Sequence, residues 1–444
     1  MYTSIADRGW SERPPAVPDR RALRFLTAGS VDDGKSTLIG RLLYDSRAIL
    51  ADQLDTLERR AAGAPIDLSL LTDGLEAERE QGITIDVAYR YFATRKRKFI
   101  IADAPGHEQY TRNMVTAAAG SDAAVVLVDI TKLDTGTRPV ALLPQTRRHA
   151  LLAQLLRVPG IVFAINKLDA IEDPGPAYAA VRDALLEFTR DAGIDVAGIV
   201  PVSALRGDNV ARPFDVPWFR GPSLLQLLES LPAAQEPTEG VLSNPVQNVA
   251  RQNAAEGARS TGGASADQRR TFWGRIASGR VAAGDEVQVF PGGQRAVVAE
   301  VLVAGDPADE GRAGQSVGIV LDRQIDVSRG DWIGTPDAVH GSQKFSATLA
   351  WLDTEPAVVG RKYVVRHGNR WVQARIAAIE SRLDIRTLVA TDAHELAVNE
   401  IGSVVVETQQ ALPVAPYAAN RVAGALIVVD PATNRTSGAL LVKG

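Results

Sequence analysis

The chain has 444 residues, a formal net charge of −4, 45% apolar residues and 23% charged residues. This length exceeds one ordinary domain, and the composition is typical of a soluble globular protein. The slightly acidic balance argues against non-specific binding to nucleic acid, and the absence of cysteine excludes disulfides, zinc ribbons and thiol catalysis.

The N-terminal stretch, residues 1–21, is polar and carries three prolines, so we expect a flexible arm. It has no apolar core of the kind that a secretion signal needs, and no apolar run in the chain approaches the roughly 20 residues of a membrane helix. We therefore expect a cytoplasmic protein that makes no contact with a membrane.

Residues 22–232 alternate short apolar runs with helical stretches. The predicted strands are Leu23–Ala28, Ile85–Phe92, Phe99–Asp103, Ala123–Asp129, Gly160–Asn166 and Ile199–Val202. The predicted helices are Lys35–Leu43, His107–Ala119, Gln145–Leu156, Ala177–Asp191 and Ser223–Leu231. This alternation predicts an α/β domain whose mostly parallel sheet carries helices on both faces.

Two β-rich regions follow, and we expect one small β-barrel in residues 233–340 and another in residues 341–444. Short β-type runs separated by glycine turns are typical of such barrels. The clearest runs are Phe272–Ala277, Asp285–Phe290, Ala296–Val303, Ser316–Leu321, Phe345–Leu352, Arg361–Val365, Val372–Ile379 and Gly424–Asp430. Two segments are interpreted as insertions of unknown role, Thr131–Pro144 and the small-residue loop Asn253–Gln268.

A phosphate-loop motif follows the first predicted strand and opens the first predicted helix. Its residues are Gly29, Ser30, Val31, Asp32, Asp33, Gly34, Lys35 and Ser36. The glycines allow successive N–H groups to turn inward on phosphate oxygens. In this context Lys35 is expected to bridge the β- and γ-phosphates and Ser36 to bind Mg²⁺, while the alternative is a chance glycine turn.

A second motif supplies candidates for the metal and for catalysis. Asp103, Ala104, Pro105, Gly106 and His107 follow a buried strand. A carboxylate there needs a partner, and Mg²⁺ reached through water is one, although a helix N-cap is the alternative for Asp103 alone. We expect Gly106 to offer its N–H to the γ-phosphate and His107 to position the attacking water.

Thr84 is interpreted as a switch residue. Its hydroxyl reaches Mg²⁺ only when the γ-phosphate holds its segment in place, which gives an ordered triphosphate state and a looser diphosphate state. The alternative is an ordinary strand threonine. The expected metal ligands are therefore Ser36, Thr84 and Asp103, and the expected catalytic groups are Lys35, Thr84 and His107.

A third motif, made of Asn166, Lys167, Leu168 and Asp169, indicates guanine. The Asp169 carboxylate can accept hydrogen bonds from the ring N–H and the exocyclic amine of guanine, a pair of donors that adenine lacks. Lys167 is expected to lie along the base and brace the phosphate loop. Ser203, Ala204 and Leu205 would offer a backbone N–H to the guanine oxygen, although alone they indicate only a helix start.

These motifs come in the order of a GTPase, and no other cluster competes with them. Five scattered histidines show no metal-ligand spacing. We interpret Arg147 and Arg148 beside His149 as a solvated helix face. Arg95–Lys98 is interpreted as a basic hairpin turn.

The motifs resemble those of the translation-factor class of GTPases, whose members carry two β-barrels after the GTPase domain. Longer stretches of the sequence indicate one family within this class. Residues 22–442 resemble the large, GTPase subunit of bacterial sulfate adenylyltransferase. The matching stretches are Arg24–Leu43, Asp73–Phe92, Lys98–Asn113, Gln145–His149, Pro217–Pro222, Gly274–Gly279, Glu400–Gly402, Pro416–Tyr417 and Asn420–Arg421.

The resemblance implies a heterodimer with a small subunit that transfers adenylyl from ATP to sulfate. The products are adenosine 5′-phosphosulfate and pyrophosphate, in sulfate assimilation toward cysteine. GTP hydrolysis by the large subunit, with Mg²⁺, drives this unfavourable step. The resemblance implies that the nucleotide is bound by the same residues that the motifs indicate.

Ala104 stands where the family usually has threonine. The segment Thr131–Pro144, before Gln145, is longer than the family's connection, and its usual glycine-containing turn is altered. Because no second phosphate loop follows, we expect none of the adenylylsulfate kinase activity of some relatives. Two alternatives remain open: an elongation-factor-like GTPase that delivers tRNA, and a regulatory GTPase with no coupled enzyme. The sequence does not reveal the partner's contact residues, the higher oligomeric state or the ratio of GTP to product.

Overall fold

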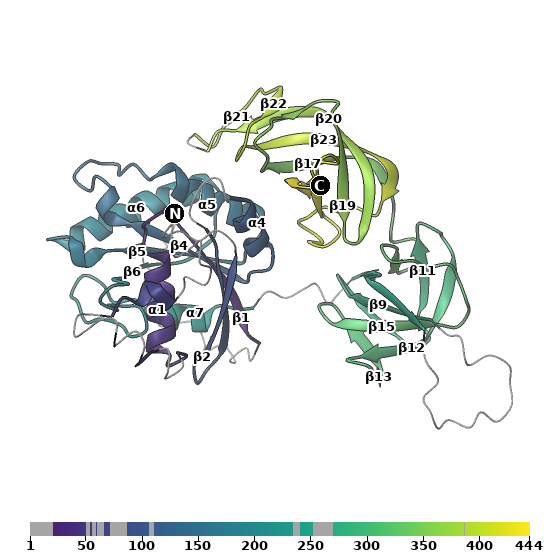
Figure 1. Cartoon of the computed structure of the whole chain (residues 1–444), viewed down its shortest axis with the longest axis horizontal. Coiled ribbons are helices and arrows are strands. Elements are labelled where there is room, and N and C mark those ends of the chain that lie inside the picture. Colours follow the sequence, from purple (N-terminus) through teal and green to yellow (C-terminus); the bar gives the residue numbers. More distant parts are fainter. Residues whose placement is uncertain are drawn as a thin grey trace, which may run out of the picture. The chain divides into compact units, whose positions relative to one another are not determined.

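The structure is a computed structural model that describes residues 21–49, 54–55, 59, 66–71, 87–105, 111–233, 240–251, 270–385 and 387–444. The chain divides into two compact units, drawn in Figure 1. The first comprises Met1–Ala234 with Ile385–Val389, and the second comprises Gln235–Asp384 with Ala390–Gly444. None of the helices in the described part of the chain combines the length and apolar character that a membrane crossing requires.

A six-stranded sheet in the order β2-β3-β1-β4-β5-β6 organises the first unit. Its strands are β1 Leu23–Ala28, β2 Ala88–Ala93, β3 Lys98–Asp103, β4 Ala123–Asp129, β5 Gly160–Asn166 and β6 Val196–Pro201. All neighbouring strands pair in parallel except β2, which is antiparallel to β3. Every residue of β4 and β5 is buried, which explains their continuous apolar runs. The mostly parallel sheet is therefore confirmed.

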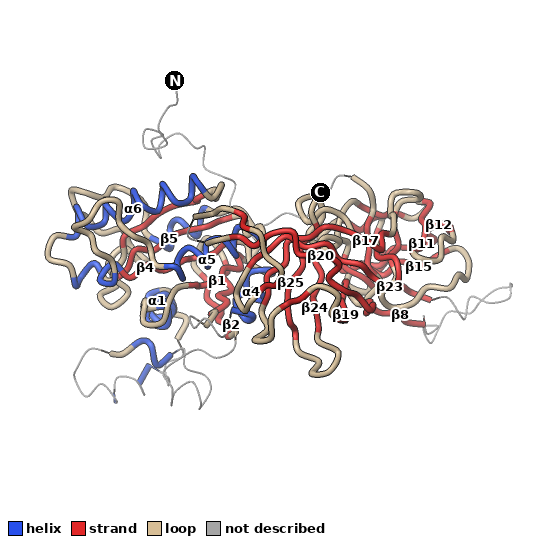
Figure 2. Tube along the Cα trace, turned by 90° about the horizontal axis from the view of Figure 1, so that it is seen from above, coloured by secondary structure: helices blue, strands red, loops and turns tan. Residues whose placement is uncertain are grey.

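Helices cover both faces of this sheet, as predicted. They are α1 Lys35–Asp45, α4 Thr111–Ala119, α5 Pro144–Leu155, α6 Pro174–Asp191 and α7 Leu224–Ser230, with short 3-10 turns η2 Leu68–Leu71, η4 Ile130–Lys132 and η5 Leu168–Ala170. α1 and α7 share one core cluster with the sheet, and Figure 2 shows α6 on the opposite side of the sheet from α1. A capping box between Ser223 and Gln226 starts α7. The first residues of the predicted helix His107–Ala119 lie outside the described residues.

The first part of the second unit is an antiparallel sheet whose two end strands follow one another in the chain. Its strands are β7 Ser243–Pro245, β8 Asn248–Arg251, β9 Arg270–Arg275, β11 Glu286–Phe290, β12 Arg295–Val303, β13 Asp306–Ala308, β15 Ser316–Leu321 and β16 Trp332–Gly334. The order runs from β7 to β8 at its two ends, and only Val246 and Gln247 separate these end strands in the chain. β10 Arg280–Ala282 pairs with β14 Glu310–Arg312 beside this sheet.

The last part is a closed six-stranded barrel in the order β19-β24-β25-β17-β23-β20, in which β20 pairs back with β19. Its strands are β17 Ser342–Trp351, β19 Lys362–His367, β20 Arg370–Leu383, β23 Ile401–Leu412, β24 Ala425–Val429 and β25 Thr436–Val442. Three two-residue strands, β18 Ala357–Val358, β21 Ala390–Thr391 and β22 Glu395–Leu396, lie beside it. The expected barrel is confirmed, whereas the domain limits at 233 and 341 remain predictions.

Buried polar contacts join the two β-rich parts within the second unit. The ring of Trp332, from β16, stacks on the ring of His367, from β19, with centroids 5.2 Å apart. Asn420 Nδ2 donates a hydrogen bond to Ser278 Oγ at 3.3 Å. Burial lowers the pKa of His367 to about 4, so this ring is neutral at pH 7.

Candidate nucleotide site

The predicted nucleotide residues follow the carboxyl ends of parallel strands. Thr27 of β1 pairs in register with Asp103 of β3, and Asp129 of β4 pairs with Asn166 of β5. Parallel register therefore brings side chains from distant parts of the sequence to one edge of the sheet. Open α/β sheets bind ligands at this edge.

The phosphate loop joins β1 to α1, and its backbone has the conformation that its glycines predict. Gly34 has φ +91° directly before the first residue of α1, and Asp32 has φ +62°. A Cβ on Gly34 would lie 2.5 Å from Asn166 Nδ2. Only glycine fits here without strain, because both the left-handed backbone and the close approach exclude a side chain.

Lys35 and Asp33 are buried inside this loop. Lys35 Nζ donates to the carbonyl oxygens of Gly29 at 3.0 Å and Ser30 at 2.8 Å. Burial lowers the pKa of Lys35, while the charges of Asp103 and Asp33 act to raise it. The Asp33 carboxylate accepts the Ser30 N–H at 2.6 Å. The loop thus holds Lys35 on its own carbonyl oxygens, within the electrostatic influence of Asp103 and Asp33.

Asp103 and Ser36 supply oxygen atoms of the kind that Mg²⁺ prefers. Asp103 is 2% exposed, and Thr27 Oγ1 donates to its Oδ1 at 3.2 Å. Ser36 lies in the first turn of α1 and is partly buried. Within the described residues, no group of three or more His, Cys, Asp or Glu side chains could hold a metal alone. These donors fit a magnesium ion that takes its other ligands from phosphate and water.

The predicted residues Thr84, Gly106 and His107 lie outside the described residues. Their switch and catalytic roles stay predictions. Ala104 and Pro105 are described, and both are buried directly after β3.

Asn166 connects three segments of the site. It is 2% exposed, its Nδ2 donates to the Asp33 carbonyl at 2.8 Å, and its Oδ1 accepts the Ala204 N–H at 2.9 Å. The Ala204 N–H is therefore engaged by the protein. Ser203, Ala204 and Leu205 were predicted to meet the guanine oxygen. Of these, Leu205 is exposed, with 65% of its surface accessible to solvent.

Asp169 lies on η5 and is partly buried. Its neighbours Leu168 and Asn166 are buried, so the short turn η5 is anchored to the end of β5. A carboxylate in this position is able to accept the paired donors of guanine. The geometry agrees with the motif, although the base contact itself remains a proposal.

The loop contact predicted for Lys167 is made by another lysine. Lys167, at φ +65°, forms an ion pair with Asp129, with Nζ 2.8 Å from Oδ2. Lys132, on η4, instead contacts the phosphate loop through Val31 O at 2.5 Å and Asp33 Oδ1 at 2.8 Å. The sequence interpretation missed Lys132 and Asp129, because it treated the segment after β4 as an insertion. The available signal was a carboxylate at the end of a fully apolar strand.

The predicted solvated face around Arg147 and Arg148, both partly exposed, does not extend to His149. His149 on α5 is 2% exposed, and its Nε2 lies 3.0 Å from Gln145 Nε2. Arg147 lies over the ring of Phe188 at 4.9 Å instead of extending into water. Burial, with the charges of Lys35 and Arg148, lowers the pKa of His149 to about 3. α5 therefore presents a neutral, buried histidine in the electrostatic environment of Lys35.

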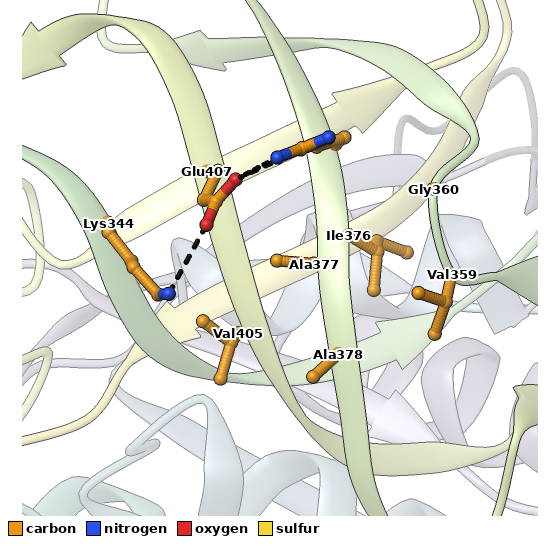
Figure 3. Close-up of a pocket in the computed structure, with 9 residues that line it drawn as sticks. Lys344, Val359, Gly360, Ile376, Ala377, Ala378, Val405 and Glu407 are labelled. Carbon is orange, nitrogen blue, oxygen red and sulfur yellow. Dashed lines mark hydrogen bonds and ion pairs between the residues drawn. The ribbon is translucent and has the colours of Figure 1, made fainter.

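A separate pocket of about 320 Å³ lies on the last barrel, lined by β17, β20 and β23 (Figure 3). Three charged residues line it, and they pair with one another: Glu407 lies 3.2 Å from Lys344 and 2.6 Å from Arg375. Hydrogen bonds from Arg375 and Lys344 lower the pKa of Glu407. Because two cations already satisfy this carboxylate, the residues that line the pocket offer no free acid or base for catalysis.

Comparison with known proteins agrees with this geometry. Residues 20–235 match the family model of the elongation factor Tu GTP binding domain, and residues 344–443 match the GTP-eEF1A C-terminal domain-like model. The chain thus contains a GTP-binding domain of the elongation factor Tu type. The crystal structure of Sup35 complexed with GDP is 21% identical, covers 98% of both chains and has a TM-score of 0.42.

Two relatives that are more than 40% identical to this chain identify its family more closely. Sulfate adenylyltransferase subunit 1 of Laribacter hongkongensis is 42% identical over 92% of this chain and 82% of its own length. The bifunctional enzyme NodQ of Azospirillum brasilense is 44% identical over 93% of this chain, which spans 64% of NodQ. The chain belongs to the family of sulfate adenylyltransferase subunit 1.

Proposed function

We propose that the chain is the GTPase subunit of a sulfate adenylyltransferase. GTP hydrolysis on this chain drives the transfer of adenylyl from ATP to sulfate, which a small partner subunit catalyses in a heterodimer. The reaction gives adenosine 5′-phosphosulfate and pyrophosphate and acts in sulfate assimilation toward cysteine. The observation that carries the proposal is a single buried network in which Asn166 joins the phosphate loop to the guanine-reading segment, in a chain 42% identical to a sulfate adenylyltransferase subunit 1.

The phosphate end of the site holds and polarises the triphosphate. N–H groups of the phosphate loop other than those of Ser30 and Asp33, which bond within the loop, face the phosphates. Lys35 neutralises charge that spreads over the γ-phosphate oxygens as the bond between the γ- and β-phosphates breaks. Ser36, Asp103 and Thr84 would hold Mg²⁺, which supplies further neutralisation when it is bound. His107 positions the attacking water. The roles of Thr84 and His107 rest on the sequence motif.

The base end selects guanine. Asp169 accepts from the ring N–H and the exocyclic amine, and the turn Ser203–Leu205 donates a backbone N–H to the guanine oxygen. An adenine base would leave the Asp169 carboxylate without these donors, so we expect strong discrimination.

Coupling requires that the GTP and GDP states differ in their affinity for a state of the partner. We propose that Thr84 and the segment after Gly106 carry this difference. We also propose a cytoplasmic location, where ATP, GTP and sulfate are available together, and no partnership with nucleic acid.

The direct test is pyrophosphate release from ATP and sulfate by the co-purified heterodimer, with GTP, with GDP and without guanine nucleotide. We expect GTP alone to raise the yield of product. Equal yields of product under the three conditions would contradict the proposed coupling and favour the alternative of a regulatory GTPase with no coupled enzyme. Co-purification of RNA in place of a protein subunit would favour the tRNA-delivering alternative.

A further inference from the structure

A carboxylate lies inside the loop that is built to hold phosphate. Asp33 is 0% exposed, and its Oδ2 accepts the Ser30 N–H at 2.6 Å. This bond fixes the turn of the loop, but it also places a buried negative charge beside an anionic ligand. An uncompensated buried charge of this kind opposes the binding of phosphate.

Lys132 compensates this charge from outside the loop. Its Nζ lies 2.8 Å from Asp33 Oδ1 and donates to the Val31 carbonyl at 2.5 Å. Lys132 is 33% exposed, whereas Asp33 is fully buried, so the pair is only partly screened by water. The contact of Lys132 with the Val31 carbonyl holds the loop backbone, and its contact with Asp33 neutralises the carboxylate charge. Lys132, and not Lys35, therefore forms the ion pair with Asp33.

A second carboxylate extends the network to the base end. Asp129 is 1% exposed and accepts from Thr131 N at 3.0 Å and from Thr131 Oγ1 at 2.6 Å. Its Oδ2 lies 2.8 Å from Lys167 Nζ and 3.8 Å from Lys132 Nζ. Charges of alternating sign therefore run from the phosphate loop to the guanine-reading segment through Asp33, Lys132, Asp129 and Lys167.

We infer that Lys132 is a positioning residue that holds the phosphate loop ready for nucleotide and, through Asp129, links it to the guanine-reading segment. This inference rests on the proposed GTP site. It requires no contact between Lys132 and the nucleotide. The structure assigns to Lys132 the neutralisation of Asp33, so its loss is expected to weaken GDP and GTP binding by the same factor.

The test compares Lys132→Met, Asp33→Asn and the double variant by calorimetry with GDP and with GTP. We expect Lys132→Met to raise both dissociation constants at least tenfold, because it leaves Asp33 as a buried unpaired charge. The double variant is expected to bind at least threefold more tightly than Lys132→Met, since the asparagine amide in place of the Asp33 carboxylate carries no charge to neutralise. A purely structural role for Lys132 predicts no such recovery.

The matched control is Lys96→Met. Lys96 forms an ion pair with Glu229 at 2.8 Å, at the turn between β2 and β3, and it is 67% exposed. Its loss is expected to leave nucleotide affinity within twofold of the wild type. Wild-type affinity in Lys132→Met, or a double variant no better than Lys132→Met, would overturn the inference while leaving the GTP site intact. Failure of the wild-type protein to bind GDP would instead overturn the proposed function.

Discussion

Replacing Asn166 with alanine tests the connection between the phosphate loop and the base-reading segments. The side chain is 2% exposed and makes two hydrogen bonds, to the Asp33 carbonyl at 2.8 Å and from the Ala204 N–H at 2.9 Å. Alanine leaves both backbone groups buried without this partner, at a cost of about 1–3 kcal/mol each. If the two costs fall on the nucleotide-binding conformation, even the lower bound of about 2 kcal/mol corresponds to roughly 30-fold weaker binding.

The assay is titration calorimetry with GDP, accompanied by thermal unfolding to establish that Asn166→Ala is folded. Asn420→Ala is the matched control, because Asn420 is also buried and its Oδ1 accepts two backbone N–H groups, from Val422 and Ala423, both at 3.0 Å in the second unit. The control should lose stability and keep its affinity for GDP. A folded Asn166→Ala variant with less than a threefold change in GDP affinity would refute the reasoning.

Three further outcomes are expected. Gly34→Ala should abolish measurable GDP binding in a protein that still folds, since its Cβ would lie 2.5 Å from the Asn166 amide at a φ of +91°; calorimetry checks this. Removal of divalent metal with a chelator should weaken GTP binding in the wild type but have little effect in Asp103→Asn, if Asp103 helps to hold Mg²⁺. Because burial holds the pKa of His367 at about 4, below its ordinary value of 6.5, the unfolded chain binds the proton first. His367 alone should then contribute a fall of about 2 kcal/mol in the free energy of unfolding between pH 7 and pH 5, and His367→Gln should remove this contribution in urea titrations.

The strands that carry the site were predictable because a strand buried on both faces of a sheet consists of a short, nearly continuous run of apolar residues. β1, β4 and β5 match their predicted limits residue for residue, since each is an apolar run that ends where the chain turns. The motifs after β1 and β5 share one edge because parallel register leaves them no other place. Local patterns were therefore enough to identify Lys35, Asn166 and Asp169 as site candidates.

The contacts that join these motifs were not predictable in the same way. Lys132 reaches Asp33 across 99 positions of the sequence, and no local spacing announces such an ion pair. The two arginines before His149 suggested a solvated helix face, yet tertiary packing buries the His149 side chain on α5. The two-residue strands, such as β18 and β21, are too short to show a period of two. Local patterns specify elements, whereas long-range pairing decides which polar side chains become buried.

The most direct test is a calorimetric comparison of GDP, ADP and xanthosine diphosphate on the wild-type chain and on Asp169→Asn. Xanthine carries an oxygen where guanine carries the amine, so an asparagine amide can donate to it where a carboxylate cannot. The wild type should bind GDP at least a hundredfold more tightly than ADP, and Asp169→Asn should lose GDP and gain xanthosine diphosphate. Equal affinity of the wild type for GDP and ADP, or unchanged GDP binding by Asp169→Asn, would contradict a guanine site read by Asp169.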